Sequence, residues 1–302
     1  MKQLLTASAA YKILDGDARA NRLSHAYMLD FPDPKNLRAA LLEFALKLFG
    51  TTAGDPVGAR ILKGAYPDCK LYPAEGKKLN AEAVGEILDD CALRPVEGSK
   101  KLYIISGFDE ASALLQNKML KTLEEPLEGI YFLLGVTSLA PVLDTVRSRV
   151  RVLEIPPFTE AQIYAALERR GHNELNAAAA RSANGVLGVA ENLVSGGWFG
   201  AVSDGARELC SITRLKDAGA ACAKYGETKY KQELLSEMQR LYFAALTGET
   251  TLPLTRPALV FALEKLVGAF ADLRFNANFS GLLYDFLLEV VKENDKWLKL
   301  SV

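Results

Sequence analysis

Short apolar runs alternate with helical patterns along the first half of the chain. Five runs have the length of strands: 25–30 (HAYMLD), 69–73 (CKLYP), 101–107 (KLYIISG), 130–137 (IYFLLGVT) and 150–155 (VRVLEI). They do not alternate polar with apolar residues, as strands covered on both faces of a parallel sheet need not. Helical patterns lie between them, and this alternation is typical of right-handed βαβ units. The pattern predicts an α/β fold with a parallel five-stranded sheet.

One of the predicted helices spans 112–125 and is ended by Pro126. Glu124 and Glu125 fall at its C-terminal end, where the helix macrodipole disfavours negative charge by roughly a few tenths of a kcal/mol. This placement indicates either that the glutamates have a use elsewhere or that the helix end is exposed and tolerates them.

Beyond 155–162 the pattern is helical throughout. The segment 195–200 (SGGWFG) is the best linker candidate, because its glycines break the helical periodicity. Residues 282–300 predict a long amphipathic helix whose wide apolar face needs a partner, within the chain or outside it. A chain of 302 residues exceeds the usual size of one core, so we expect two or three domains.

Composition narrows the classes of function. The net charge is −1 and the pI is about 6.2, so any contact with DNA must be local or shared with partners. Four isolated cysteines and two isolated histidines leave little for zinc sites, disulfides or Ser-His-Asp chemistry. The N-terminus turns polar too early for a signal peptide, and no apolar run reaches membrane-spanning length. We expect a cytoplasmic protein without membrane contact.

Four blocks of sequence occur in an order that resembles the AAA+ clamp-loader family, and within it the delta-prime subunits of bacterial DNA polymerase III. The blocks are 22–29 (RLSHAYML), 66–87, 101–138 and 143–150 (LDTVRSRV). Residues 117–126 (NKMLKTLEEP) are close to the family's Asn-Ala-Leu-Leu-Lys-Thr-Leu-Glu-Glu-Pro signature. The resemblance covers about residues 10–195. It implies an AAA+ (P-loop NTPase-like) α/β domain at 1–157, a helical lid at 158–198 and an all-α C-terminal collar domain for oligomerisation at 199–302.

The resemblance also implies a degenerate P-loop after the first strand. A working loop needs glycines whose N–H groups wrap the phosphates, a lysine for the β/γ oxygens and a Ser/Thr for Mg²⁺. Phe31, Pro34 and Asn36 stand at the glycine positions, Leu37 at the lysine position and Arg38 at the hydroxyl position. Pro34 also has no N–H to donate. We therefore expect no bound nucleotide.

The residues that would bind Mg²⁺ and the arginine of the lid are also missing. The strand 101–107 ends in Ser106 and Gly107, where two acidic residues should hold Mg²⁺ and orient water. Asp109 and Glu110 come too late and are interpreted as capping charges. By the same resemblance, the place of a nucleotide-sensing arginine in the lid is taken by Gly188.

Two other features of the family are changed or have lost their purpose. The segment 50–66 lacks the four-cysteine zinc module, and Cys69 alone cannot hold zinc, so we expect no metal and no cofactor. Thr137 occupies the family's sensor-1 position and, with no nucleotide to sense, is interpreted as a structural relic.

The segment 144–150 (DTVRSRV) resembles the family's Ser-Arg-Cys box, with Ser148 and Arg149 present and Val150 in place of the cysteine. Taken alone, both arginines of the segment would be interpreted as solvated surface residues. In clamp loaders the arginine of this box points across a subunit boundary toward a neighbour's γ-phosphate. The resemblance implies that Arg149 is a catalytic arginine finger supplied in trans, while Arg147 stays a surface residue.

These features favour a subunit of the replicative clamp loader that does not hydrolyse ATP. It would be no enzyme on its own, but a component of the DNA polymerase III holoenzyme, a DNA-directed DNA polymerase and nucleotidyltransferase. Its expected partners are the gamma/tau ATPase and delta subunits, with sliding clamp and primer-template DNA reached indirectly, and the isolated chain is expected to be monomeric.

Two alternatives remain open on the sequence. One is an AAA+-derived scaffold that works outside the replisome, because the C-terminal third carries the weakest resemblance. The other is an active ATPase of the gamma/tau type, against which the missing lysine at Leu37 and the missing acids at Ser106 and Gly107 count heavily.

Overall fold

The computed structural model describes residues 1–274 and 278–300. The chain divides into two compact units, Met1–His172 with Ala183–Glu191 and Asn173–Ser182 with Asn192–Val302. The first is the sheet unit and the second is the helical unit. The domain boundaries predicted after residues 157 and 198 stay predictions, since the segment 158–198 contributes residues to both units.

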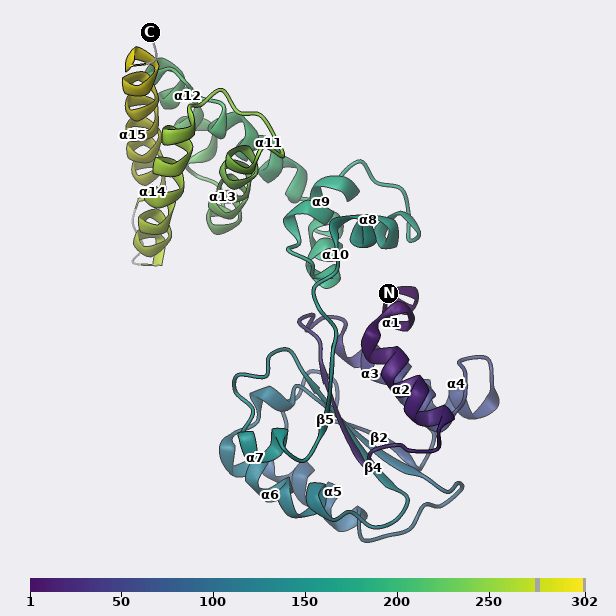
Figure 1. Cartoon of the computed structure of the whole chain (residues 1–302). Coiled ribbons are helices and arrows are strands. Elements are labelled where there is room, and N and C mark those ends of the chain that lie inside the picture. The colour runs from purple at the N-terminus through teal and green to yellow at the C-terminus, as the bar shows by residue number, and fades with distance from the viewer. Residues whose placement is uncertain (275–277, 301–302) are drawn as a thin grey trace. The chain divides into compact units, whose positions relative to one another are not determined.

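A five-stranded parallel sheet forms the centre of the sheet unit (Figure 1). Its strands lie in the order β2-β3-β4-β1-β5. Their bounds are β1 Ala26–Asp30, β2 Cys69–Tyr72, β3 Lys101–Ser106, β4 Ile130–Val136 and β5 Arg151–Glu154. Strands β1, β3 and β4 are buried along almost their whole length, which explains their continuous apolar sequences. The predicted fold class is confirmed.

Helices cover both faces of this sheet. The helices of the sheet unit are α1 Lys2–Ala7, α2 Ala9–Arg19, α3 Leu37–Phe49, α4 Pro56–Leu62, α5 Ala81–Asp90, α6 Ala113–Glu124, α7 Asp144–Arg147 and α8 Glu160–Glu168, with a 3₁₀ turn η1 at Phe108–Glu110, and α8 lies away from the sheet (Figure 1). On one face, Val84, Met119 and Val146 from α5, α6 and α7 pack into a single core with the strands. On the other face α3 lies close to β4: a Cβ added to Gly135 would stand 2.5 Å from the Leu41 side chain.

Three of the longer helices of this unit lie where the sequence predicts them, although α5 ends at Asp90, and α2 is not among the predicted helices. The predicted helices at 36–49, 80–93 and 112–125 correspond to α3, α5 and α6. Helix α3 ends at Gly50, whose φ of 69° suits a residue without a Cβ. Helix α5 starts after Asn80, whose side chain accepts a hydrogen bond from the Ala83 N–H.

The described residues of the helical unit form helices connected by turns. These are α9 Asn176–Ser182, α11 Phe199–Cys210, α12 Leu215–Tyr225, α13 Lys231–Thr247, α14 Arg256–Arg274 and α15 Phe279–Leu300. Helix α10, Leu187–Ser195, has its first five residues in the sheet unit and the rest in the helical unit. It ends three residues before α11 begins, so the glycine-rich segment at 195–200 is a short connection.

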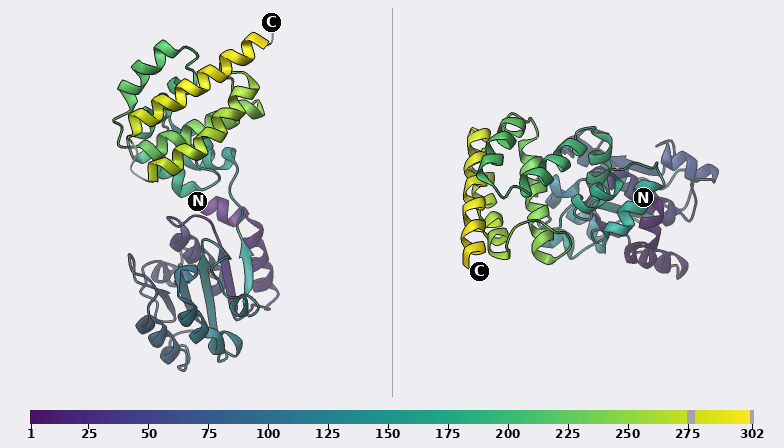
Figure 2. Two further views of the ribbon diagram at one scale, coloured as in Figure 1. Left: turned by 90° about the vertical axis from the view of Figure 1, so that its left-hand side faces the viewer. Right: turned by 90° about the horizontal axis from the view of Figure 1, so that it is seen from above.

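The predicted amphipathic helix at 282–300 lies within α15 and finds its partner inside the chain. Leu283, Leu287 and Val290 are buried in one apolar core with side chains of α11 to α14. Helices α14 and α15 pack side by side along much of their length (Figure 2). Among the described residues, no helix combines the length and apolar character needed to cross a membrane.

Candidate nucleotide pocket and arginine finger

The loop at 31–36 joins β1 to α3, where a P-loop would hold phosphates. Four of the five side chains predicted to replace the P-loop residues make contacts within the chain, and Pro34 is exposed. Phe31 is buried and packs edge-to-face on Phe158, with 6.0 Å between ring centroids, and Leu37 is buried in the core. The guanidinium of Arg38 donates to the Pro73 carbonyl over 2.7 Å.

Asp33 fills the centre of this loop. Its side chain is only 1% exposed. The carboxylate accepts hydrogen bonds from the Asn36 backbone N–H at 3.2 Å and from the Asn36 side-chain amide at 2.8 Å. It also accepts one from the Gly188 N–H at 2.8 Å. Asp33 was not predicted as a site residue. Its local partner in the sequence is Asn36, three residues later.

Gly188, predicted to stand where the lid arginine is lost, lies against this carboxylate. A Cβ added there would be 2.3 Å from Asp33 Oδ1 and 2.8 Å from Lys35 Cβ. Any side chain at residue 188 would therefore displace Asp33 or the loop. In the same helix, Glu191 forms ion pairs with Lys35 at 3.2 Å and with Arg170 at 2.7 Å.

The carboxyl ends of the neighbouring strands are also acidic. Asp109 accepts from the Thr137 hydroxyl at 2.7 Å and from the Thr137 N–H at 3.0 Å, so it holds the loop after β4. Burial, and then the charges of Glu154 and Asp109, raise the pKa of Asp30 at the end of β1. Strand β3, which lies next to β4 in the sheet, ends at Ser106 and is followed by Gly107, and neither residue adds a charge. These carboxylates would repel an anionic phosphate placed beside them.

Arg149 lies at the opposite edge of the sheet. It follows α7 and stands two residues before β5, whereas the loop at 31–36 follows the end of β1, which runs parallel to β5. The length of a strand, roughly 15 Å, separates the two positions. The Arg149 side chain therefore lies out of reach of the loop at 31–36 in its own chain.

The Arg149 guanidinium has local contacts but stays reachable. Nη1 donates to the Thr145 carbonyl at 2.8 Å and to Ser148 Oγ at 3.3 Å, and Nη2 lies 3.2 Å from Glu124 Oε2. Its side chain is 30% exposed. Arg147 is more exposed and pairs only locally with Asp144 among the described residues. The two arginines thus have different carboxylate partners, and Ser148 contacts the Arg149 guanidinium.

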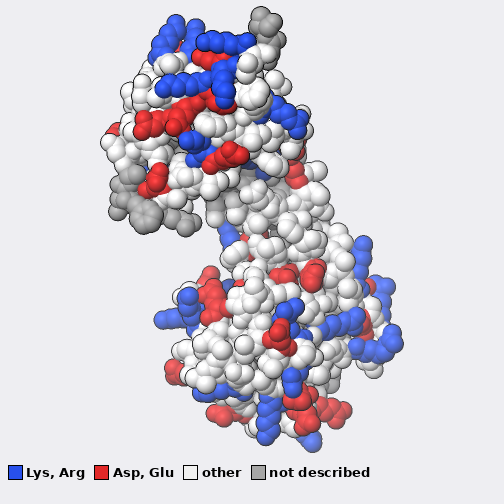
Figure 3. All heavy atoms as spheres, turned by 60° about the vertical axis from the view of Figure 1, so that its left-hand side comes forward, with Lys and Arg blue, Asp and Glu red and all other residues white. Residues whose placement is uncertain are grey.

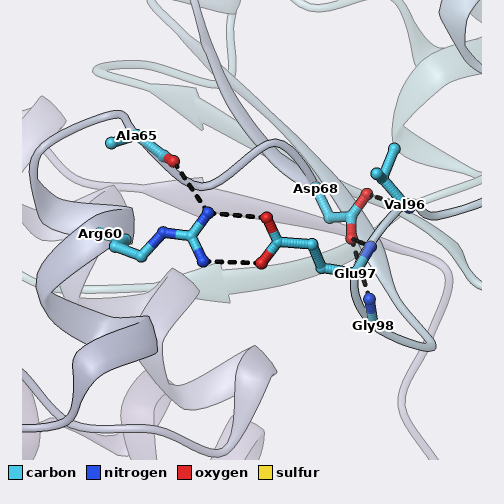
Figure 4. Close-up of polar contacts among 6 residues, drawn as sticks. All are labelled: Arg60, Ala65, Asp68, Val96, Glu97 and Gly98. Atoms are coloured by element: carbon cyan, nitrogen blue, oxygen red, sulfur yellow. Dashed lines mark hydrogen bonds and ion pairs between the residues drawn. The ribbon is translucent and has the colours of Figure 1, made fainter.

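The segment where the zinc module is missing is held by polar contacts. Arg60 of α4 forms two hydrogen bonds with Glu97, at 2.6 and 2.7 Å (Figure 4). The buried Asp68 accepts from the N–H groups of Val96, Glu97 and Gly98. Among the described residues, no cluster of His, Cys, Asp or Glu could hold a metal ion.

Figure 3 shows the charges on one face of the molecule. On the face drawn in Figure 3, basic and acidic side chains intermix over both units. This face offers no broad basic area of the kind that binds DNA strongly.

Comparison with known proteins identifies the family. A model described as "DNA polymerase III, delta subunit" matches residues 6–159, about half of the chain. The chain belongs to this family. It is 30% identical to the DNA polymerase III subunit delta' of Bacillus subtilis over 153 residues, which are 49% of this chain and 46% of that protein. It is 31% identical to the gamma subunit of Buchnera aphidicola (subsp. Baizongia pistaciae) over 105 residues, 34% of this chain and 28% of that protein.

The chain thus spans about half the length, or less, of the curated relatives it matches. Among solved structures, a gamma subunit-related protein of Thermotoga maritima is 17% identical, with a TM-score of 0.44 and coverage of 93% of this chain and 99% of that one. The clamp loader delta protein of Bacillus subtilis is 12% identical, with a TM-score of 0.38 and coverage of 94% and 99%.

The predicted resemblance to the delta-prime subunits is confirmed by the family and by the names of the relatives. The family match spans the loop at 31–36, the end of β3 and Arg149. It ends at residue 159 and so leaves Gly188 and the helical unit outside. The roles of all these residues stay predictions.

Proposed function

We propose that this chain is a non-hydrolysing subunit of the replicative clamp loader that lends Arg149 to the ATP site of a neighbouring subunit. The observation that supports this most is the position of Arg149, which is partly exposed and lies a strand's length away from the loop at 31–36 of its own chain. An arginine supplied in trans stabilises charge that develops on the transferred phosphoryl group, and can raise turnover by about 10³–10⁵.

Loss of its own nucleotide site is the second half of the proposal. The loop at 31–36 is occupied by the chain's own carboxylate, and the strand ends beside it carry acids and no lysine. The chain would then act in DNA replication as a scaffold in the cytoplasm. Its helical unit would join the gamma/tau ATPase and delta subunits, and the assembled ring would place the sliding clamp on primed DNA.

The test uses the reconstituted complex with Arg149→Ala in this chain and Arg147→Ala as the matched control. Arg149→Ala is expected to leave assembly intact and to slow ATP turnover at the neighbouring site by at least about a hundredfold. Arg147→Ala should behave like the wild type. Unchanged turnover in Arg149→Ala would overturn the finger. Micromolar ATP binding to the isolated chain in calorimetry would overturn the loss of the nucleotide site.

A scaffold outside the replisome is the second candidate. The family match ends at residue 159, so it says nothing of the helices that would choose partners. A pull-down with the gamma/tau and delta subunits separates the two: failure to join either subunit favours the alternative.

A further inference from the structure

Two helices of the sheet unit begin beside the carboxylate of Asp33. Asn36, which donates to it, directly precedes α3, and Gly188, which also donates to it, lies in the first turn of α10. The first N–H groups of a helix have no partner inside the helix, and its N-terminal end carries partial positive charge. One negative group therefore satisfies two helix ends at once.

In a working P-loop protein, the anion at the end of the first strand is a phosphate of the nucleotide. Here the anion belongs to the chain. Asp33 and its donor Gly188 are 155 residues apart in sequence, and the carboxylate is almost fully buried. Hydrogen bonds to a buried charged group are among the stronger ones in proteins.

We propose that Asp33 replaces a nucleotide phosphate as the anion that holds the first turn of α10 on the sheet unit, so that this part of the predicted lid keeps its place without nucleotide. The nearby pair between Lys35 and Glu191 joins the same two segments. The absence of a Cβ at Gly188 lets the backbone N–H approach the carboxylate, since a methyl group would collide with Oδ1. The proposal concerns the isolated chain and does not depend on Arg149.

Hydrogen exchange of the full-length chain without nucleotide tests this bridge. Asp33→Ala is expected to speed exchange of the α10 amides between Leu187 and Glu191 by about tenfold or more, since a hydrogen bond to a charged acceptor is lost. Amides of β4 should keep their protection, which shows that the sheet remains folded. Wild-type α10 should exchange at the same rate with and without ATP.

Gly188→Ala approaches the same contact from the other side. Alanine favours the helix more than glycine does, so faster exchange in this variant cannot come from weaker helix propensity. The double variant should exchange no faster than the faster single variant, because both break one contact. Asp68→Ala is the matched control, since Asp68 is also buried and accepts three backbone N–H bonds. It should loosen residues 96–98 and leave α10 unchanged.

Each other outcome overturns the proposal. Wild-type exchange of α10 in both Asp33→Ala and Gly188→Ala would mean that the bridge holds nothing. Severalfold slowing of wild-type α10 exchange by ATP would mean that the helix waits for nucleotide. Equal loosening of α10 by Asp68→Ala would mean that the effect is one of global stability.

Discussion

The guanidinium of Arg149 and the carboxylate of Glu124 form an ion pair, with 3.2 Å between Nη2 and Oε2. Glu124 is the last residue of α6, where negative charge opposes the helix dipole. The arginine offsets that unfavourable placement, which answers the question that the two glutamates raise in the sequence. Arg149 Nε is buried and has no hydrogen-bond partner among the described residues. The guanidinium is therefore fixed by its other hydrogen bonds, while its Nε–H donor has no acceptor in the described part of the chain.

If Arg149 serves a neighbour's phosphate, Glu124 competes for the same guanidinium edge. Glu124→Gln removes the competing charge, so ATP turnover of the assembled complex is expected to rise by up to about fivefold, the limit set by an exposed ion pair. Single-turnover ATP hydrolysis measures this. The stability of the isolated chain should change little, because Glu124 is half exposed.

Glu125→Gln is the matched control, because Glu125 is the next residue and is exposed. Its turnover should equal that of the wild type. Slower turnover in Glu124→Gln would contradict the competition and indicate that Glu124 orients the arginine instead.

The central strands β1, β3 and β4 and most of the longer helices could be predicted because each buries many apolar residues in a regular pattern. β3 buries five of its six residues, and α6 places Met119 and Leu123 in the core. Short helices had no such signal. Helix α4 has seven residues and buries Gly58 and Ile61 alone, so its pattern is too short to distinguish from a loop.

The candidate site was predictable only in part. The resemblance predicts losses at Leu37 and Gly188, because it assigns each position a chemistry that these residues lack, and both losses stay predictions. The gain at Asp33 could not be predicted, since its bond to Gly188 joins two segments far apart in sequence. The pair of Glu124 with Arg149 was hidden for the same reason, although the unfavourable helix end pointed to a partner.

Because the strand ends are acidic, we expect the stability of the fold to depend on pH. Burial and the charges of Glu154 and Asp109 raise the pKa of Asp30 above its ordinary 3.8. A carboxyl whose pKa is raised on folding binds its proton more tightly in the native state, so stability falls as pH rises from about 3.8 through the raised pKa. Asp30→Asn should melt at a higher temperature than wild type at pH 7. The gain should vanish near pH 3, and thermal melts at both pH values measure it.

Asp90 behaves in the opposite way. Although burial pushes the pKa of Asp90 upward, hydrogen bonds from Lys70, Tyr103 and Lys101 hold it at about 2. Its stabilising effect is complete above pH 3.8, the unperturbed value, and is lost as pH falls through 2. Asp90→Asn leaves Lys101, which is 2% exposed, without its counter-charge. Because solvent reaches a fifth of the Asp90 side chain, we expect a loss of roughly 2 kcal/mol, less than for a fully buried pair.

Urea unfolding at pH 7 measures this loss. Lys101→Met in the Asp90→Asn background should restore part of it, because the uncompensated buried charge is removed. Additive losses in the double variant would contradict the pairing.

We expect the segment at 50–66 to keep its structure without a bound metal. Arg60 and Glu97 join α4 to the loop before β3 with two hydrogen bonds, and Arg60 also lies over the Tyr66 ring, 5.2 Å from its centroid. Arg60→Ala should speed hydrogen exchange in α4 and leave the central strands protected, since the contact is on the surface. A chelator such as EDTA should leave both the melting temperature and α4 exchange of the wild type unchanged. A lower melting temperature with EDTA, reversed by added zinc, would show that a metal holds this segment instead.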